Sequence, residues 1–199
     1  MPPPTPAVGR NEPAPSLPAG LRLVDLAGAE RERAVPVIRD GFVGIYRWHA
    51  KRTLREVPTV RAVTRDGEVV GVSLLDRLAP EVGYVYYIVV LSALRRRGIA
   101  RALLDDALAS FGASGAWVVY AAVQADNLPS RRLFERRGFR SVERKETGWR
   151  EGGLGAWGLR SRMRLVPGEL LLGLRLAAAA EGGAAATGEG SVRPATDGA

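Results

Sequence analysis

The chain has 199 residues, 46% of them hydrophobic and 25% charged, which is typical of one globular domain with a real core. It has no cysteine and a single histidine, so disulfides, a thiolate nucleophile and cysteine-based or histidine-rich metal sites are excluded, and we expect no metal. The net charge of +8 is carried almost wholly by arginine. Such a charge attracts any polyanion and does not by itself distinguish a nucleic acid from a nucleotide cofactor.

The sequence carries no targeting signal that we can identify. No apolar run approaches the roughly 20 residues of a membrane-spanning helix, and residues 1–4, Met-Pro-Pro-Pro, lack the features of a secretory signal. We therefore expect a cytoplasmic protein that makes no use of a membrane.

Residues 2–20 hold seven of the thirteen prolines, and residues 177–199 are mostly alanine and glycine. These compositions predict disordered tails at 1–20 and 177–199 around one domain at 21–176.

The first half of the domain begins with a strand and two helices. Leu21–Leu26 alternates apolar and polar residues as a strand does, and Ala29–Asp40 is typical of a helix, although Pro36 interrupts it. A second short helix is predicted at Tyr46–Arg55. Asp66-Gly67 is a strong two-residue hairpin signal.

That hairpin signal separates Thr59–Arg65 from Glu68–Leu75, and a turn at 79–83 leads into Tyr84–Leu91, which predicts three consecutive antiparallel strands. After Gly98 the apolar spacing becomes helical and predicts a helix that ends at Gly112. The later predicted elements are a strand at Trp117–Val123, a helix at Leu128–Arg137 and two strands at Arg140–Trp149 and Ala156–Val166. Together these elements predict an α/β protein with a mixed sheet. The leucines of 170–176 are expected to cap the core or to join a partner subunit, which leaves a homodimer open.

One segment predicts a ligand. The strand Tyr84–Leu91 runs into Arg95-Arg96-Arg97-Gly98-Ile99-Ala100-Arg101 at a helix start. The first turn of a helix has backbone N–H groups without intrahelical partners, the helix dipole adds partial positive charge there, and the arginines add full charges. The predicted ligand carries phosphates.

A second motif, Asn127-x-x-Ser130-x-x-Leu133-Phe134-x-x-x-Gly138-Phe139, narrows that ligand. With Arg95-x-x-Gly98-x-Ala100, it makes residues 21 to 166 resemble the GNAT superfamily of acyl-CoA-dependent N-acyltransferases. The resemblance implies a single-domain GNAT-like mixed sheet, mostly antiparallel and flanked by helices. Its one parallel strand pair, here Tyr84–Leu91 and Trp117–Val123, would splay apart around the cofactor.

The resemblance also implies which residues bind acetyl-CoA. Gly98 lets the backbone approach the pyrophosphate of coenzyme A, and a backbone N–H near Val90 faces the thioester carbonyl. Asn127 holds the pantetheine end. The full expected cofactor set is Ile88, Val89, Val90, Arg95, Arg96, Arg97, Gly98, Ile99, Ala100, Arg101, Asn127 and Ser130.

The usual acid and base of the family are missing. Phe134 stands where members carry a tyrosine that protonates the departing thiolate, and Tyr84 and Ala122 stand where they carry carboxylates. Losing one general acid typically costs about 10²–10⁴ in rate, so transfer by positioning remains feasible. Alternate strand residues share a face, so we nominate Tyr84 first and Tyr86 second to take the proton of the amine.

Other candidates have ordinary structural explanations. His49 is a secondary candidate base in a segment that often forms the acceptor wall in the family. Trp149 and Trp157 either line the acceptor pocket or pack in the core or at an interface. The arginines of the second motif form a solvated helix face, with a minor share assisting the 3′-phosphate; they are Arg131, Arg132, Arg136 and Arg137.

The sequence thus favours an acetyl-CoA-dependent N-acetyltransferase. A neutral primary amine, on a small molecule or a protein, attacks the thioester in a ternary complex. The alternative is a non-catalytic acyl-CoA-binding sensor or regulatory module, favoured by the missing acid and base. Nucleic-acid binding rests on net charge alone and is the least favoured reading. The sequence does not identify the acceptor.

Overall fold

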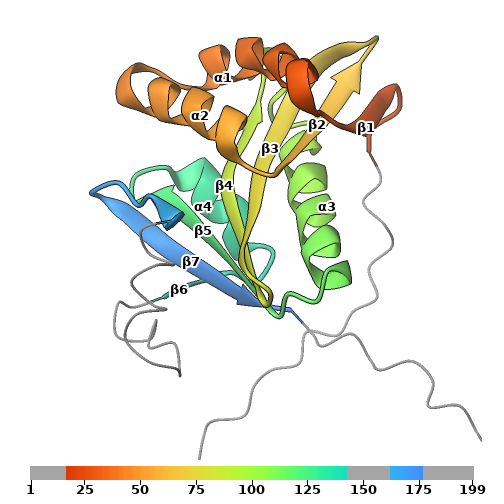
Figure 1. Cartoon of the computed structure of the whole chain (residues 1–199). Coiled ribbons are helices and arrows are strands. Elements are labelled where there is room, and N and C mark those ends of the chain that lie inside the picture. Colours follow the sequence, from red (N-terminus) through yellow and green to blue (C-terminus); the bar gives the residue numbers. More distant parts are fainter. Residues whose placement is uncertain (1–16, 143–161, 177–199) are drawn as a thin grey trace, which may run out of the picture.

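A mixed sheet of seven described strands, in the order β1-β2-β3-β4-β5-β7-β6, organises the protein (Figure 1). The computed structural model describes residues 17–142 and 162–176. Among the strands in these ranges, β4 and β5 are the one parallel pair and every other neighbouring pair is antiparallel. The predicted fold class, a single α/β domain with a mostly antiparallel sheet, is confirmed.

Except for the last strand, the elements follow the predicted order. The strands are β1 (Leu21–Asp25), β2 (Thr59–Arg65), β3 (Glu68–Ala79), β4 (Val82–Val90), β5 (Val118–Gln124), β6 (Arg140–Ser141) and β7 (Glu169–Arg175). The α-helices are α1 (Val35–Gly41), α2 (Gly44–Glu56), α3 (Ile99–Ala113) and α4 (Leu128–Glu135). Two 3₁₀ helices, η1 (Gly28–Ala34) and η2 (Ser92–Leu94), precede α1 and α3.

Local turn chemistry explains the early boundaries. Asp66 and Gly67 both have positive φ, 51° and 84°, as the tight turn between β2 and β3 requires. Pro36 lies in the first turn of α1 rather than inside a longer helix, because a proline in the first turn loses no hydrogen bond. The predicted helix at 29–40 is therefore a 3₁₀ helix followed by an α-helix.

The helices cover the two faces of the sheet. On one face, α1 and α2 bury apolar residues against β2, β3 and β4. On the other, α3 and α4 pack on β4, β5 and β7, and Figure 1 shows α3 on the opposite side from α1. The contact with α3 is close at Gly83, where a Cβ would lie 2.7 Å from the ring of Phe111.

The prediction at 156–166 is wrong in its described part. Arg162 and Met163 are helical, residues 164–168 are irregular or turn residues, and the strand is β7, which lies between β5 and β6. Pro167-Gly168, with Gly168 at φ 88°, supplies the turn. The leucine run is an inner strand of the sheet, and Leu172 at 2% exposure is part of the core.

Several predictions lie outside the described residues. They are the tail at 1–16, the strand at 143–149 with Trp149, the segment 156–161 with Trp157, and the tail at 177–199. The domain and tail boundaries stay predictions. In the ranges that the structure describes, no helix has both the length and the apolar character to cross a membrane.

Candidate active site

The parallel strands β4 and β5 pair only over their first residues. Val82–Val85 of β4 pairs with Val118–Ala121 of β5, and the ladder ends there although both strands continue. Figure 1 shows the two strands moving apart from the end where they pair. We call the unpaired continuations, Tyr86–Val90 and Ala122–Gln124, the β4–β5 divergence. Beyond Val85, β5 no longer pairs with β4, so an extended ligand could add to β4 there as a strand does.

The arginine–glycine segment lies directly after β4. Gly98 is the N-cap of α3 with φ 82°, and Arg96 also has positive φ at 63°. The first intrahelical bond runs from the Ala102 N–H to the Gly98 oxygen, so the N–H groups of the first turn point out of the helix end. A Cβ on Gly98 would meet nothing within 4 Å, so the space in front of this helix end is open.

An aspartate from α1 anchors this segment. The backbone N–H of Ser92 donates to Oδ2 of Asp40 at 2.6 Å, and its hydroxyl donates to Oδ1 at 3.0 Å. These hydrogen bonds lower the pKa of Asp40, with a smaller contribution from Arg95. The Arg95 side chain also donates from Nε to the Val90 carbonyl at 3.3 Å. No local pattern in the sequence marks Asp40, because its partner lies 52 residues away.

The second motif begins α4 directly after β5. Asn127 is the N-cap of α4, and its side-chain oxygen accepts from the Ser130 N–H at 3.2 Å. The carboxyl ends of parallel strands lie at the same edge of a sheet. The structure therefore brings the N-terminus of α3, with residues 95–101, and the N-terminus of α4, with Asn127 and Ser130, to one edge beside the β4–β5 divergence.

A β-bulge gathers three tyrosines on the opposite side of β4 from α3. Leu74 of β3 pairs with Tyr87, whereas Leu75 pairs with Val85, so Tyr86 is an extra residue in β4. A bulge shifts the alternation of side chains. Tyr84, Tyr86 and Tyr87 consequently all face the side of α1 and α2, and the rings of Tyr84 and Tyr86 meet edge to face at 4.7 Å.

The hydroxyls of the two nominated tyrosines are already engaged. Tyr84, at 1% exposure, donates to the Met163 carbonyl at 3.0 Å, and Tyr86 donates to the Arg162 carbonyl at 2.6 Å. Burial raises the pKa of both, that of Tyr84 well above its usual range. A tyrosine acts as a base only after losing its proton, so either residue would first have to break this hydrogen bond. Their catalytic role stays a prediction.

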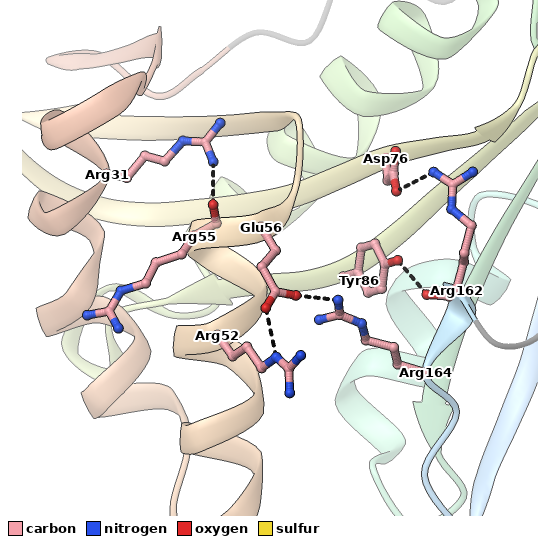
Figure 2. Close-up of polar contacts among 8 residues, drawn as sticks. All are labelled: Arg31, Arg52, Arg55, Glu56, Asp76, Tyr86, Arg162 and Arg164. Carbon is pink, nitrogen blue, oxygen red and sulfur yellow. Dashed lines mark hydrogen bonds and ion pairs between the residues drawn. The ribbon is translucent and has the colours of Figure 1, made fainter.

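The segment that these tyrosines hold is residues 162–168, which we call the β7 lead-in. Figure 2 shows its further attachments. Arg162 donates to the Leu78 carbonyl at 2.8 Å and to Asp76 at 3.1 Å. Glu56, in the last turn of α2, lies between two arginines and accepts from Arg52 at 2.7 Å and from Arg164. The lead-in is thus tied to β3, β4 and α2.

A carboxylate that was not among the predicted site residues lies at the end of this segment. Glu169 is the first residue of β7 and pairs with Gln124, the last residue of β5. The amide of Gln124 donates to the Tyr46 hydroxyl of α2 at 2.5 Å, and Oε2 of Glu169 accepts from the Val166 N–H at 2.8 Å. In the sequence, Glu169 is recognisable only as an acidic residue before an apolar run. Its nearness to the candidate site follows from the pairing of β7 with β5.

The positions that carry the usual acid and base have ordinary surroundings here. Phe134 is 5% exposed and meets Phe139 edge to face at 5.0 Å within the core beneath α4. Ala122 is half-buried among apolar residues on the tyrosine side of the sheet. His49 is half-buried on α2 with its ring 5.0 Å from that of Trp48. Among the described residues, no group of three or more potential ligands could hold a metal ion.

A family comparison agrees with this geometry. The model of the acetyltransferase (GNAT) family matches residues 28–139, more than half of the chain. The chain belongs to the GNAT acetyltransferase family. Family and fold support an acetyltransferase that uses acetyl-CoA as acetyl donor. No curated protein sequence matches the chain significantly.

Solved structures share the fold at low sequence identity. The ribosomal-protein-S18-alanine N-acetyltransferase from Escherichia coli is 16% identical, with a TM-score of 0.60 over 81% of this chain and 97% of that chain. A GNAT family acetyltransferase from Elizabethkingia anophelis with acetyl-CoA bound is 13% identical, with a TM-score of 0.59 over 80% and 100%. N-acetylglutamate synthase from Neisseria gonorrhoeae is 17% identical, with a TM-score of 0.59 over 81% of this chain and 36% of that chain.

Proposed function

We propose that this protein transfers the acetyl group of acetyl-CoA to a primary amine by direct attack within a ternary complex. The observation that carries the proposal is the β4–β5 divergence with two helix N-termini at its edge. Such an arrangement offers backbone hydrogen bonds to an extended arm and backbone N–H groups to phosphates.

Different residues at the β4–β5 divergence would bind different parts of acetyl-CoA. The N-terminus of α3, with Arg95–Arg101 and the open space at Gly98, would hold the pyrophosphate. The backbone of Ile88–Val90 would bind the pantetheine arm as an added strand. Asn127 and Ser130 would contact its end once the amide of Asn127 turns from the helix cap toward the ligand. This assignment follows the family resemblance and is supported by the backbone conformation at Gly98.

The chemistry needs no covalent intermediate on the protein. The amine nitrogen attacks the thioester carbonyl, the carbon–sulfur bond breaks, and its electron pair leaves with the sulfur of coenzyme A. A thiol has a pKa of about 8.5, so its thiolate leaves tolerably well although Phe134 has no proton to donate. A backbone N–H near Val90 would stabilise the oxyanion that forms. The attacking nitrogen must be neutral, so a base has to accept its proton.

The acceptor remains a class rather than a compound. Similar folds act on a ribosomal-protein alanine and carry N-acetyl-glutamate, as their names state. The amine would approach from the side of α2 and the β7 lead-in, where Tyr86 and the Glu56–Arg164 ion pair lie (Figure 2). Peptide N-termini, lysine side chains, small amines and amino acids are the classes to test.

The second candidate is a non-catalytic acyl-CoA-binding module, which Phe134 and Ala122 favour. Two measurements separate the candidates. Calorimetric titration with acetyl-CoA should show binding that Gly98→Glu abolishes, and an acceptor panel read by free thiol release should show turnover with one amine class. Binding without turnover on any amine would favour the module. Absence of acetyl-CoA binding would overturn both candidates.

A further inference from the structure

Glu169 lies on the same face of the sheet as the position of the missing carboxylate. It pairs with Gln124, and Leu171, two residues further along β7, pairs with Ala122. Residues paired across two strands share a face, and diagonal neighbours lie about 7–8 Å apart. Glu169 is therefore the diagonal neighbour of Ala122 and presents a carboxylate beside the place where many relatives carry theirs.

The carboxylate is unusual in this arginine-rich protein. The other half-buried acids in the described ranges all have arginine partners: Asp76 with Arg162, Asp105 with Arg137, and Asp106 with Arg61. Glu169 is also half-buried, but it has no arginine partner among the described residues. A partly desolvated carboxylate without a cation costs folding free energy, and a cationic or proton-donating ligand would offset that cost.

The surroundings of Glu169 suit proton transfer. Oε2 is fixed by the Val166 N–H, whereas Oε1 has no hydrogen bond from any described residue. Its titratable neighbours are Tyr46 and His49 from α2 and Tyr84 and Tyr87 from β4. Burial raises the pKa of Glu169, and the Val166 N–H and His49 oppose that rise. A raised pKa makes the carboxylate a stronger base toward an amine.

The nominated tyrosines have a different part in this arrangement. Their hydroxyls hold Met163 and Arg162, and Arg164 fastens the same segment to Glu56. The chain between these attachments and Glu169 is short and turns at Gly168. Tyr84 and Tyr86 thus position the first residue of β7 relative to β4.

We propose that Glu169 is the general base of the acetyl transfer, supplied by β7 in place of a carboxylate on β4 or β5. This inference rests on the proposed function. As the amine nitrogen bonds to the carbonyl carbon, its proton passes to Oε1 of Glu169. The carbon–sulfur bond breaks, coenzyme A leaves as the thiolate, and the proton then passes from Glu169 to solvent.

The test compares Glu169→Gln with the wild type on the best amine of the panel. Glutamine keeps the size of the side chain and an oxygen for the Val166 N–H, but it accepts no proton. We expect kcat to fall about 10²–10⁴-fold, with the dissociation constant of acetyl-CoA unchanged. Glu169→Asp should retain part of the activity. The matched control is Glu68→Gln, an exposed acid at the β2–β3 hairpin, with wild-type kinetics expected.

The pH profile gives a readout that a structural role would not move. The acid limb of kcat/KM should contain the ionisation of Glu169 in the wild type and in Glu169→Asp, and it should lose that ionisation in Glu169→Gln. Tyr84→Phe and Tyr86→Phe should keep it. If Glu169→Gln keeps a kcat within tenfold of the wild type and shows the same acid limb, the role of Glu169 is wrong, whereas the proposed function still holds. A wild type that binds acetyl-CoA but acetylates no amine would overturn the proposed function and this inference with it.

Discussion

Gly41 at the end of α1 lies so close to Val89 of β4 that a Cβ on the glycine would be 2.3 Å from Cγ1 of the valine. The helix on the acceptor side therefore packs directly on the strand proposed to bind the donor. Gly41→Ala should lower the free energy of unfolding by about 1–3 kcal/mol, as measured by urea denaturation. Gly112→Ala in α3, whose nearest side-chain atom would be 3.8 Å away, should be neutral or stabilising. Equal stabilities for the two variants would contradict the close packing.

Gly98→Ala should separate binding from stability. The positive φ of 82° makes any side chain strained by about 1–2 kcal/mol, and the new methyl group would project into the open space before α3. Gly115→Ala has the same strain at φ 85° and the same free space, but it lies beyond the other end of α3. Calorimetry should show weakened acetyl-CoA binding for Gly98→Ala alone. Equal affinity in both variants would place the phosphates elsewhere.

Asp40→Ala should weaken acetyl-CoA binding several-fold, because Ser92 loses both of its hydrogen bonds to the anchor. Charge alone predicts the reverse, since the variant removes a negative charge near Arg95. The sign of the change in Kd therefore shows whether anchoring or charge dominates, and tighter binding would refute the anchoring role.

The pKa of Asp40 is lowered, so its carboxylate and the hydrogen bonds to Ser92 are present above the ordinary aspartate pKa. They are lost only as the pH falls through the pKa of Asp40 in the folded protein. Acetyl-CoA affinity should therefore show no Asp40-dependent loss between about pH 7 and 5.

The ion pair between Arg61 of β2 and Asp106 of α3 should contribute to stability. Two hydrogen bonds of 2.8 Å join them, and their side chains are 22% and 15% exposed. Among the acids that the structure describes, Asp106→Ala leaves the guanidinium with only the exposed Asp25, so we expect a loss of about 2–4 kcal/mol in thermal or urea unfolding. Glu30→Ala, which removes an exposed pair with Arg33, should change stability by less than about 0.5 kcal/mol. If Asp106→Ala lowers the free energy of unfolding no more than Glu30→Ala does, the ion pair with α3 does not stabilise the protein.

Local signals predicted most of the fold. The Asp66-Gly67 turn, the four-residue apolar spacing after Gly98 and the glycine at 138 each act within a few residues of the elements they bound. The strand β7 was not predicted, because its leucines stand at successive positions and show no alternation of apolar and polar residues. Its place between β5 and β6 depends on pairing with Val118–Gln124, far earlier in the chain.

The donor half of the candidate site was predictable for the same reason, since each of the two helix starts proposed to bind acetyl-CoA follows its strand directly. The acid–base half was not. The hydroxyl of Tyr84 meets a carbonyl 79 residues away, and Glu169 gains its neighbours only through the sheet order. A family pattern also directs attention to the positions where relatives keep their carboxylates, and here those positions hold Tyr84 and Ala122.

The most direct test of the account is mass spectrometry of the amine panel after incubation with acetyl-CoA carrying a carbon-13 acetyl group. We expect labelled acetyl on an amine nitrogen of one acceptor class, with one coenzyme A released for each acetyl transferred. If the protein binds acetyl-CoA yet leaves every amine unlabelled, the proposed acetyl transfer is wrong.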